Sequence, residues 1–351
     1  MSAPGRLRVV VATPLSAELI DRIQQLEPRL DLVHDPSLLP VSRFPGDHTG
    51  DPSYRRTPAQ QLAFEQLVDT AEALYGVPDE DPAQLRRTAA ANPALRWVQT
   101  MPAGGGGQVK AAELSGEELA RIAFSTSAGV HAEPLAEFAV FGVLAGAKSL
   151  PRLLQQQAAA EWSERWVMPL ISEQRVLVVG LGNIGRATAT KLAALGATVA
   201  GVSRRAVELP GVDRIIPPAE LTEAVADFDA VVVTLPGTAE TESLIDARVF
   251  SALSPGTTVV NVGRGTVIDE PALVDALESG RVGFAVLDVF AAEPLAASSP
   301  LWRHPRVLVS PHTAGLNPAE DRLIAELFAD NAGRLLDGRE LINRVNTVEF
   351  Y

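Results

Sequence analysis

The sequence predicts an α/β protein with parallel sheets in two Rossmann-like or flavodoxin-like domains. Short apolar runs alternate with helical patterns along most of the 351 residues, and strands that alternate with helices pair in parallel. The apolar run Val176–Val179 leads into Gly180-Leu-Gly-Asn-Ile-Gly185. This arrangement is typical of a strand, a tight turn and a helix that bind a dinucleotide. The length allows two domains with separate cores.

Composition excludes several classes of protein. The net charge of −13 argues against a nucleic-acid or anionic-membrane surface, because phosphates require a positive face. The absence of cysteine excludes disulfides, cysteine nucleophiles and Cys-ligated zinc, and no other metal site is expected. The opening run at 6–12 is typical of a strand rather than a signal peptide. No apolar run has the ~18 residues of a membrane span, so we expect a cytoplasmic protein.

The first third of the chain contains alternating strand and helix patterns. A polar segment rich in Pro and Gly, residues 36–57, is predicted to be a long loop, and loops of this length are often functional. Ser16 is the expected N-cap of the first helix. The predicted strands and helices are, in order, 7–12, 16–26 (helix), 30–33, 59–70 (helix), 73–78, 82–91 (helix), 95–101 and 122–125.

A run of four glycines, Gly104–Gly107, follows the strand at 95–101. Glycine leaves backbone amides accessible at low steric cost, so this run could form the floor of an anion site. A flexible turn explains it equally well.

The second half repeats the alternation after a long apolar helix at 129–148, which we expect to be buried between domains or between subunits. Strands are predicted at 175–179, 197–202, 230–235, 257–262, 282–288 and 306–310, and a final helix at 318–336. The β-branched runs at 231–233 and 257–260 predict central strands. In this doubly wound pattern, ligands bind at the carboxyl ends of the strands.

Three glycines define the predicted dinucleotide site. Gly180 permits the tight turn, Gly182 leaves room for a pyrophosphate, and Gly185 lets the helix pack closely on the strand. Free N–H groups at the start of the helix would face the phosphates.

The end of the strand at 197–202 predicts the cofactor. An acidic residue that binds the ribose 2′-hydroxyl of NAD is expected there, but the chain has Ser203-Arg204-Arg205. Arginines form forked hydrogen bonds with phosphate. We therefore expect NADP, with NAD as the alternative.

Other strand ends carry candidate catalytic groups. Arg264 lies between two glycines and could hold a carboxylate through two parallel bonds, although a surface salt bridge explains it as well. Glu293 and His312 follow the next two strands. Of the five histidines, His312 alone follows a predicted buried strand on the ligand-facing edge. A nearby carboxylate stabilises an imidazolium, which suits a general acid–base.

These residues make the chain similar to the D-isomer-specific 2-hydroxyacid dehydrogenase family, in its glyoxylate/hydroxypyruvate reductase-like branch. The matching segments are 180–186, 234–236, 261–269, 285–295 and 310–315, and the first half adds 95–100 and 127–134. The resemblance implies a substrate domain of 1–128 plus 316–351 around an inserted dinucleotide-binding domain of 129–315. It also implies a homodimer whose interface includes the helix after Glu133.

The resemblance assigns roles to individual residues. Arg264 binds the substrate carboxylate and carbonyl, His312 is the acid–base, and Glu293 is the partner of His312. The implied cofactor contacts are Gly180, Gly182, Asn183, Ile184, Gly185, Ser203, Arg204, Arg205, Leu235, Pro236, Val262, Gly263, Asp288, His312 and Gly315. The implied substrate contacts besides Arg264 are Tyr75, Gly76, Val77, Ala103 and Gly104.

Two functions follow. The first is an oxidoreductase that transfers a hydride from NAD(P)H to a small 2-keto acid and gives an (R)-2-hydroxy acid, with His312 as proton donor. The second is a non-catalytic dinucleotide-sensing protein of the same fold. The long loop at 36–57 and the glycine run depart from the family pattern, and both lie where substrate side chains are expected to bind.

Overall fold

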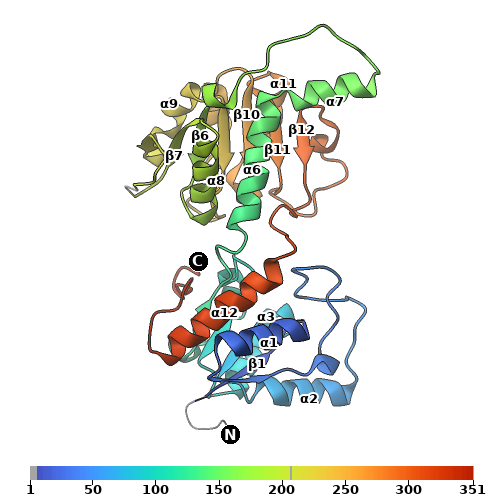
Figure 1. The fold of residues 1–351 in the computed structure, drawn as a ribbon, viewed down its shortest axis with the longest axis vertical. Helices are drawn as coiled ribbons and strands as arrows, with labels where there is room; N and C mark the ends of the chain where they lie inside the picture. Colours follow the sequence, from blue (N-terminus) through green and yellow to red (C-terminus); the bar gives the residue numbers. More distant parts are fainter. Residues whose placement is uncertain (1–5, 206–207, 351) are drawn as a thin grey trace. The chain divides into compact units, whose positions relative to one another are not determined.

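The computed structural model describes residues 6–205 and 208–350. Contacts between residues divide the chain into two compact units. Unit 1 comprises Met1–Val130 and Leu316–Tyr351, and unit 2 comprises His131–Gly315. The predicted domain boundaries, after 128 and after 315, lie within two residues of these divisions. Figure 1 shows the elements of each unit.

Unit 1 is built on a five-stranded parallel sheet with the order β2-β1-β3-β4-β5. Its strands are β1 Leu7–Val11, β2 Leu30–Val33, β3 Ala73–Tyr75, β4 Trp97–Gln99 and β5 Ala123–Ser125. The strand order reverses between β1 and β3. Such a reversal opens a crevice at the carboxyl edge of a parallel sheet.

The helices of unit 1 include one from the far end of the chain. α12 (Glu320–Leu336) packs beside α1, and its Phe328 stacks on Trp97 with the ring centroids 4.6 Å apart. The last segment therefore completes the core of unit 1. The other helices are α1 Ala17–Leu26, α2 Pro58–Val68, α3 Pro82–Ala91, α4 Gly106–Ala111 and α5 Gly116–Arg121, with the 3-10 turns η1 Pro36–Leu38 and η2 Pro78–Glu80.

In unit 1, the sequence predicted the start of α1 correctly but did not predict the helix that begins within the glycine run. Ser16 caps α1 by accepting a hydrogen bond from the Leu19 N–H, as predicted. Of the two interpretations of the glycine run, the flexible turn does not describe Gly106 and Gly107, which form the start of α4. A Cβ on Gly105 would lie 1.7 Å from Thr100 Oγ1, so packing requires glycine at that position.

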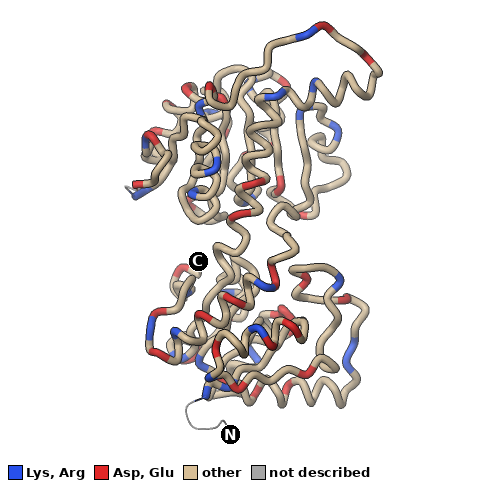
Figure 2. The backbone as a smooth tube through the Cα atoms, in the orientation of Figure 1, with Lys and Arg blue, Asp and Glu red and all other residues tan. Residues whose placement is uncertain are grey.

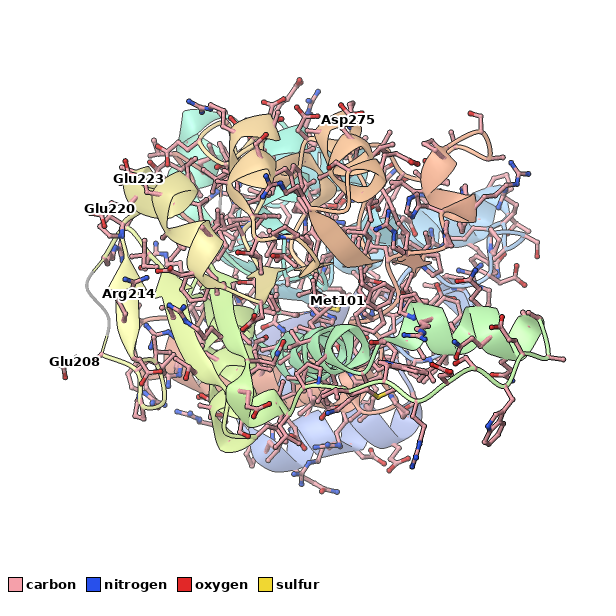
Figure 3. The ribbon with its side chains drawn as sticks, turned by 90° about the horizontal axis from the view of Figure 1, so that it is seen from above. Met101, Glu208, Arg214, Glu220, Glu223 and Asp275 are labelled. Carbon is pink, nitrogen blue, oxygen red and sulfur yellow. The ribbon has the colours of Figure 1, made fainter. Side chains whose placement is uncertain are left out.

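Unit 2 contains a seven-stranded parallel sheet with the order β12-β11-β10-β9-β6-β7-β8. Its strands are β6 Arg175–Val179, β7 Thr198–Val202, β8 Arg214–Ile216, β9 Ala230–Val233, β10 Thr257–Asn261, β11 Val282–Leu287 and β12 Val307–Val309. The predicted strands at 231–233 and 257–260 are interior ones. β8 was not predicted, because three residues with an exposed arginine give little apolar signal; Figure 3 labels Arg214 on it. β12 is a half-buried edge strand, so the prediction of a buried strand before His312 was wrong.

Helices cover both faces of the unit 2 sheet. One face carries α6 Ala132–Ala147 and α8 Asn183–Ala194, and the other carries α9 Leu221–Ala224, α10 Ala247–Ala252 and α11 Glu270–Glu278. α6 approaches β10 so closely that a Cβ on Gly146 would lie 2.0 Å from Thr258 Oγ1. The chain then turns at Ser149 into α7 Leu150–Ala158, which has no buried residue.

Acidic and basic residues are both distributed along the backbone of each unit (Figure 2). Within residues 6–205 and 208–350, no helix combines the length and the apolar character that crossing a bilayer requires.

Candidate active site

The glycine turn between β6 and α8 forms an open cradle. Gly180 has a φ of +102°, which side chains rarely tolerate. A Cβ on Gly185 would lie 1.9 Å from the carbonyl oxygen of Gly180, whereas a Cβ on Gly182 would meet no atom within 4 Å. The turn thus requires glycine for packing at one position and leaves space at another, next to the N–H groups of Asn183 and Ile184 that begin α8.

Neighbouring strand ends pack against this turn. Thr234, after β9, donates a hydrogen bond from its hydroxyl to the carbonyl oxygen of Gly180 at 2.8 Å. A Cβ on Gly263 would lie 2.5 Å from the backbone oxygen of Leu235. Val262 is buried, Leu235 is half-buried and Pro236 is exposed. The predicted cofactor contacts from β6, β9 and β10 therefore lie along one edge of the sheet.

The end of β7 presents the predicted phosphate-binding arginines. Ser203 Oγ accepts a hydrogen bond from the Arg205 N–H at 3.2 Å, which folds the turn. Arg204 and Arg205 are both exposed. Arg204 forms an ion pair with Glu240, with Nη1 and Oε2 2.5 Å apart, and sequence reasoning did not select Glu240.

Arg264 lies in a turn that two buried contacts hold in shape. Asn261, at the end of β10, donates from Nδ2 to the Arg264 carbonyl at 3.0 Å and accepts from the Gly263 N–H at 3.0 Å. A Cβ on Gly265 would lie 1.8 Å from the backbone carbon of Phe290. The turn is fixed while the Arg264 side chain is exposed, an arrangement suited to binding an anionic ligand.

His312 and Glu293 form a hydrogen-bonded pair. His312 Nδ1 lies 2.7 Å from Glu293 Oε2, and the side chains are 49% and 35% exposed. His312 has a φ of +53°, an uncommon conformation for a residue with a side chain, and such conformations cluster at functional sites. Since Glu293 occupies Nδ1, the other ring nitrogen, Nε2, is the one that can reach a ligand.

Arg264 acts on the same carboxylate. Burial by itself raises the pKa of Glu293, but the hydrogen bonds from His312 and from the Phe290 N–H, with the charges of His312 and Arg264, outweigh burial and lower it. Glu293 is therefore ionised at neutral pH. Residues from three separate strand ends contribute to one electrostatic site.

Asp288 supports the turn that carries His312. It is fully buried, and its Oδ1 accepts hydrogen bonds from Ser310 Oγ at 2.6 Å and from the N–H groups of Thr313 and Ala314 at 3.0 and 3.1 Å. Its Oδ2 has no hydrogen-bond partner among the described residues. Asp288 thus anchors the 310–314 turn, and its implied contact with a cofactor stays a prediction, as does that of Gly315 just after the turn.

The implied substrate contacts in unit 1 differ in exposure. Tyr75 is 1% exposed and packs edge-on against Phe328, so its side chain belongs to the core and only its backbone can face a ligand. Gly76 packs on Thr13, and Val77 is buried. Ala103 and Gly104 are exposed.

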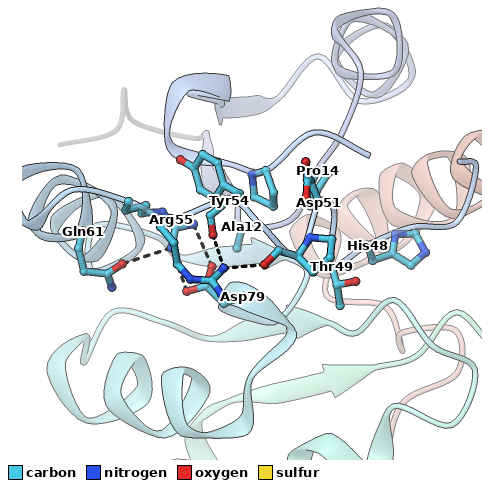
Figure 4. A pocket seen from close by; sticks show the side chains of 12 residues that line it. Ala12, Pro14, His48, Thr49, Asp51, Tyr54, Arg55, Gln61 and Asp79 are labelled. Atoms are coloured by element: carbon cyan, nitrogen blue, oxygen red, sulfur yellow. Dashed lines mark hydrogen bonds and ion pairs between the residues drawn. The ribbon is translucent and has the colours of Figure 1, made fainter. Parts of the chain in front are cut away.

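The loop at 36–57 lines one side of a partly open cavity of about 370 Å³ in unit 1 (Figure 4). Its arginine Arg56 is paired with Asp79 at 2.9 Å and lies 3.7 Å from the centre of the Phe64 ring. The loop is held by buried Asp47, whose carboxylate binds both the backbone and the guanidinium of Arg43. The predicted loop is therefore held by the Arg43–Asp47 ion pair within it and by the pairing of Arg56 with Asp79 of η2.

Sequence reasoning missed the residues that support the site. Asn261 and Ser310 lie inside the motifs that were recognised, and a buried polar residue at a strand end was the available signal. Glu240 lies in a polar segment without periodicity, so no local pattern singled it out.

Comparison with known proteins agrees with this geometry. The family model described as "D-isomer specific 2-hydroxyacid dehydrogenase, NAD binding domain" matches residues 140–314. Glyoxylate/hydroxypyruvate reductase A of Serratia proteamaculans is 34% identical over 190 residues, which cover 52% of this chain and 58% of the relative. For the reductase A of Yersinia enterocolitica, the match covers 51% of that relative. The chain thus spans little more than half the length of these curated relatives.

Solved structures match over almost the whole chain. A D-isomer-specific 2-hydroxyacid dehydrogenase from Xanthobacter autotrophicus, in complex with NADPH and MES, is 29% identical with a TM-score of 0.78, and the match covers 99% of this chain and all of the other. A probable 2-hydroxyacid dehydrogenase from Rhizobium etli, in complex with NADP, HEPES and L(+)-tartaric acid, is 25% identical with a TM-score of 0.72 and the same coverage.

Proposed function

The chain belongs to the D-isomer-specific 2-hydroxyacid dehydrogenase family, and we propose that it is an NADPH-dependent reductase of small 2-keto acids, giving (R)-2-hydroxy acids. The observation that carries this proposal is the His312–Glu293 hydrogen bond of 2.7 Å with the charge of Arg264 acting on the same carboxylate. Two of its relatives are named glyoxylate/hydroxypyruvate reductase A, which supports glyoxylate or hydroxypyruvate as the proposed substrate of this chain. No observation favours the non-catalytic alternative.

The cradle after β6 suits a dinucleotide. The open space at Gly182 and the N–H groups at the start of α8 match a pyrophosphate. Ser203, Arg204 and Arg205 suit a 2′-phosphate, and the two structural relatives described above were solved with NADPH or NADP. NADPH, when bound, supplies the hydride that reduces the keto carbon. In this assignment unit 2 is the dinucleotide-binding domain and unit 1 the substrate domain.

The proposed mechanism assigns a defined role to each side chain. Arg264 binds the substrate carboxylate with forked hydrogen bonds and stabilises the charge that develops on the keto oxygen. His312, as imidazolium, transfers its Nε2 proton to that oxygen. Ionised Glu293 holds Nδ1 and thereby orients the ring. Backbone groups at Gly76, Val77, Ala103 and Gly104 are the proposed substrate contacts in unit 1.

A substrate panel tests the function. We expect NADPH absorbance to fall on addition of glyoxylate, hydroxypyruvate or a larger 2-keto acid, and to fall more slowly with NADH. Absence of turnover with every 2-keto acid and both cofactors, while NADPH binds, would overturn the reductase proposal.

A double substitution tests the cofactor assignment. Ser203→Asp with Arg204→Gln restores the acidic group that binds a ribose hydroxyl and removes one phosphate ligand. We expect the ratio of kcat/KM for NADPH and NADH to reverse. An unchanged ratio would show that this turn does not select the cofactor.

A homodimer is the proposed assembly. Trp162 and Val167 are almost fully exposed, and Leu154 and Leu170 are about half exposed; large apolar side chains exposed in α7 and the segment after it suit an interaction surface. Trp162→Ser with Val167→Ser is expected to shift the dimer toward monomer in light scattering; a monomeric wild type would refute this assembly.

A cytoplasmic location, consistent with a cysteine-free chain, is checked by cell fractionation.

A further inference from the structure

The ion pair between Arg204 and Glu240 joins the predicted phosphate-binding turn to a second loop. Arg204 follows β7, and Glu240 lies between β9 and α10, 36 residues further along the chain. Nη1 of the arginine and Oε2 of the glutamate are 2.5 Å apart, and both side chains are 73% exposed. The guanidinium that was expected to bind a 2′-phosphate is therefore already paired with a carboxylate.

The loop that carries Glu240 is folded by its own hydrogen bonds. Thr241 donates from its hydroxyl to the Pro236 carbonyl at 2.7 Å and accepts from the Thr238 N–H at 2.9 Å. Pro236 is itself an implied cofactor contact. This tight turn presents Glu240 beside the end of β7, whereas Glu242 forms no ion pair with any of the described residues.

Charge decides what the pair does to a ligand. A 2′-phosphate and the Glu240 carboxylate are both anions that compete for the same guanidinium, and placed side by side they repel each other. The ribose 2′-hydroxyl of NAD carries no charge and meets no such competition. Glu240 thus opposes the cofactor that Ser203, Arg204 and Arg205 favour.

We propose that Glu240 is a specificity-determining residue, which lowers the affinity for NADPH by competing with its 2′-phosphate for Arg204. The proposal rests on the proposed cofactor. Exposed ion pairs are weak, so the competition amounts to about a two- to five-fold change in affinity. Glu240 therefore narrows the difference in binding affinity between the two cofactors.

Binding measurements on the intact protein test this role without relying on turnover. Glu240→Gln keeps the shape of the side chain and removes its charge, and Glu242→Gln makes the same change two residues away. With calorimetry we expect Glu240→Gln to lower the Kd of NADP⁺ and of 2′,5′-ADP about two- to five-fold relative to Glu242→Gln. The Kd of NAD⁺ and of 5′-AMP should be unchanged.

A second variant shows whether the effect passes through Arg204. In an Arg204→Gln background, Glu240→Gln should no longer improve NADP⁺ binding. Equal Kd values for 2′,5′-ADP in the Glu240→Gln and Glu242→Gln proteins would overturn the proposal, as would weaker NAD⁺ binding in Glu240→Gln, which would make Glu240 a ribose ligand. If the wild-type protein binds neither NADP⁺ nor NAD⁺, the proposed cofactor itself is wrong.

Discussion

Two polar clusters at strand ends use their charges in different ways. In unit 2, buried Asn261 and Asp288 hold turns whose outer side chains, Arg264 and His312, remain exposed. In unit 1, the loop at 36–57 also carries charged residues, but its buried Asp47 binds Arg43 of the same loop.

Arg56 and His48 continue this pattern in unit 1. Arg56 is 7% exposed and paired with Asp79, and His48 lies 3.6 Å from the carboxylate of Glu320. Charged residues after a strand therefore do not by themselves indicate chemistry. The informative feature is a buried polar anchor beneath an exposed reactive group.

Replacing the two histidines should give the largest contrast. His312→Asn removes the proposed proton donor, and we expect kcat to fall about 10²- to 10⁴-fold with NADP⁺ affinity unchanged. His48→Asn, the matched change in unit 1, should leave kcat within a few-fold of wild type. Steady-state kinetics and cofactor titration check both variants. Similar losses of kcat in the two variants would contradict a catalytic role for His312 that His48 lacks.

Replacing the two buried aspartates should separate stability from activity. Asp288→Asn and Asp47→Asn each disturb several hydrogen bonds to a buried carboxylate, and we expect each to lower the free energy of unfolding by about 1–3 kcal/mol. Only Asp288→Asn should also lower kcat, since it loosens the 310–314 turn beneath His312. Denaturant unfolding and kinetics measure the two effects. An Asp288→Asn protein with full activity would refute the anchoring role.

The smallest expected effect depends on pH. The pKa of Glu293 is lowered from the ordinary 4.5 in the folded protein, so its charged form contributes stability above pH 4.5 that is lost as the pH falls through the lowered pKa. The stability difference between wild type and Glu293→Gln should therefore be present at neutral pH and close in acid. The pKa of Asp47 is depressed strongly, chiefly by Arg43, so the gap for Asp47→Asn should persist to lower pH. Thermal unfolding over a pH series measures both stability differences. If the two differences vanished over the same pH range, the expected contrast between Glu293 and Asp47 would be wrong.

The sequence alone determined the parallel α/β class, nearly every strand and the glycine turn. These features depend on residues close together in the chain, such as the apolar run at 176–179 and the glycines at 180–185. The motifs around Arg264, Glu293 and His312 could be recognised for the same reason. β8 and the helical start at Gly106 could not, since neither has a distinctive local pattern.

Only the tertiary structure decided which side chains meet. The Asp288 contacts to the 310–314 turn, the burial of Tyr75 and the pairing of Arg204 with Glu240 each join segments that are separate in sequence. An ion pair or a buried hydrogen bond depends on distance in space and on exclusion of water, and a linear pattern contains neither quantity.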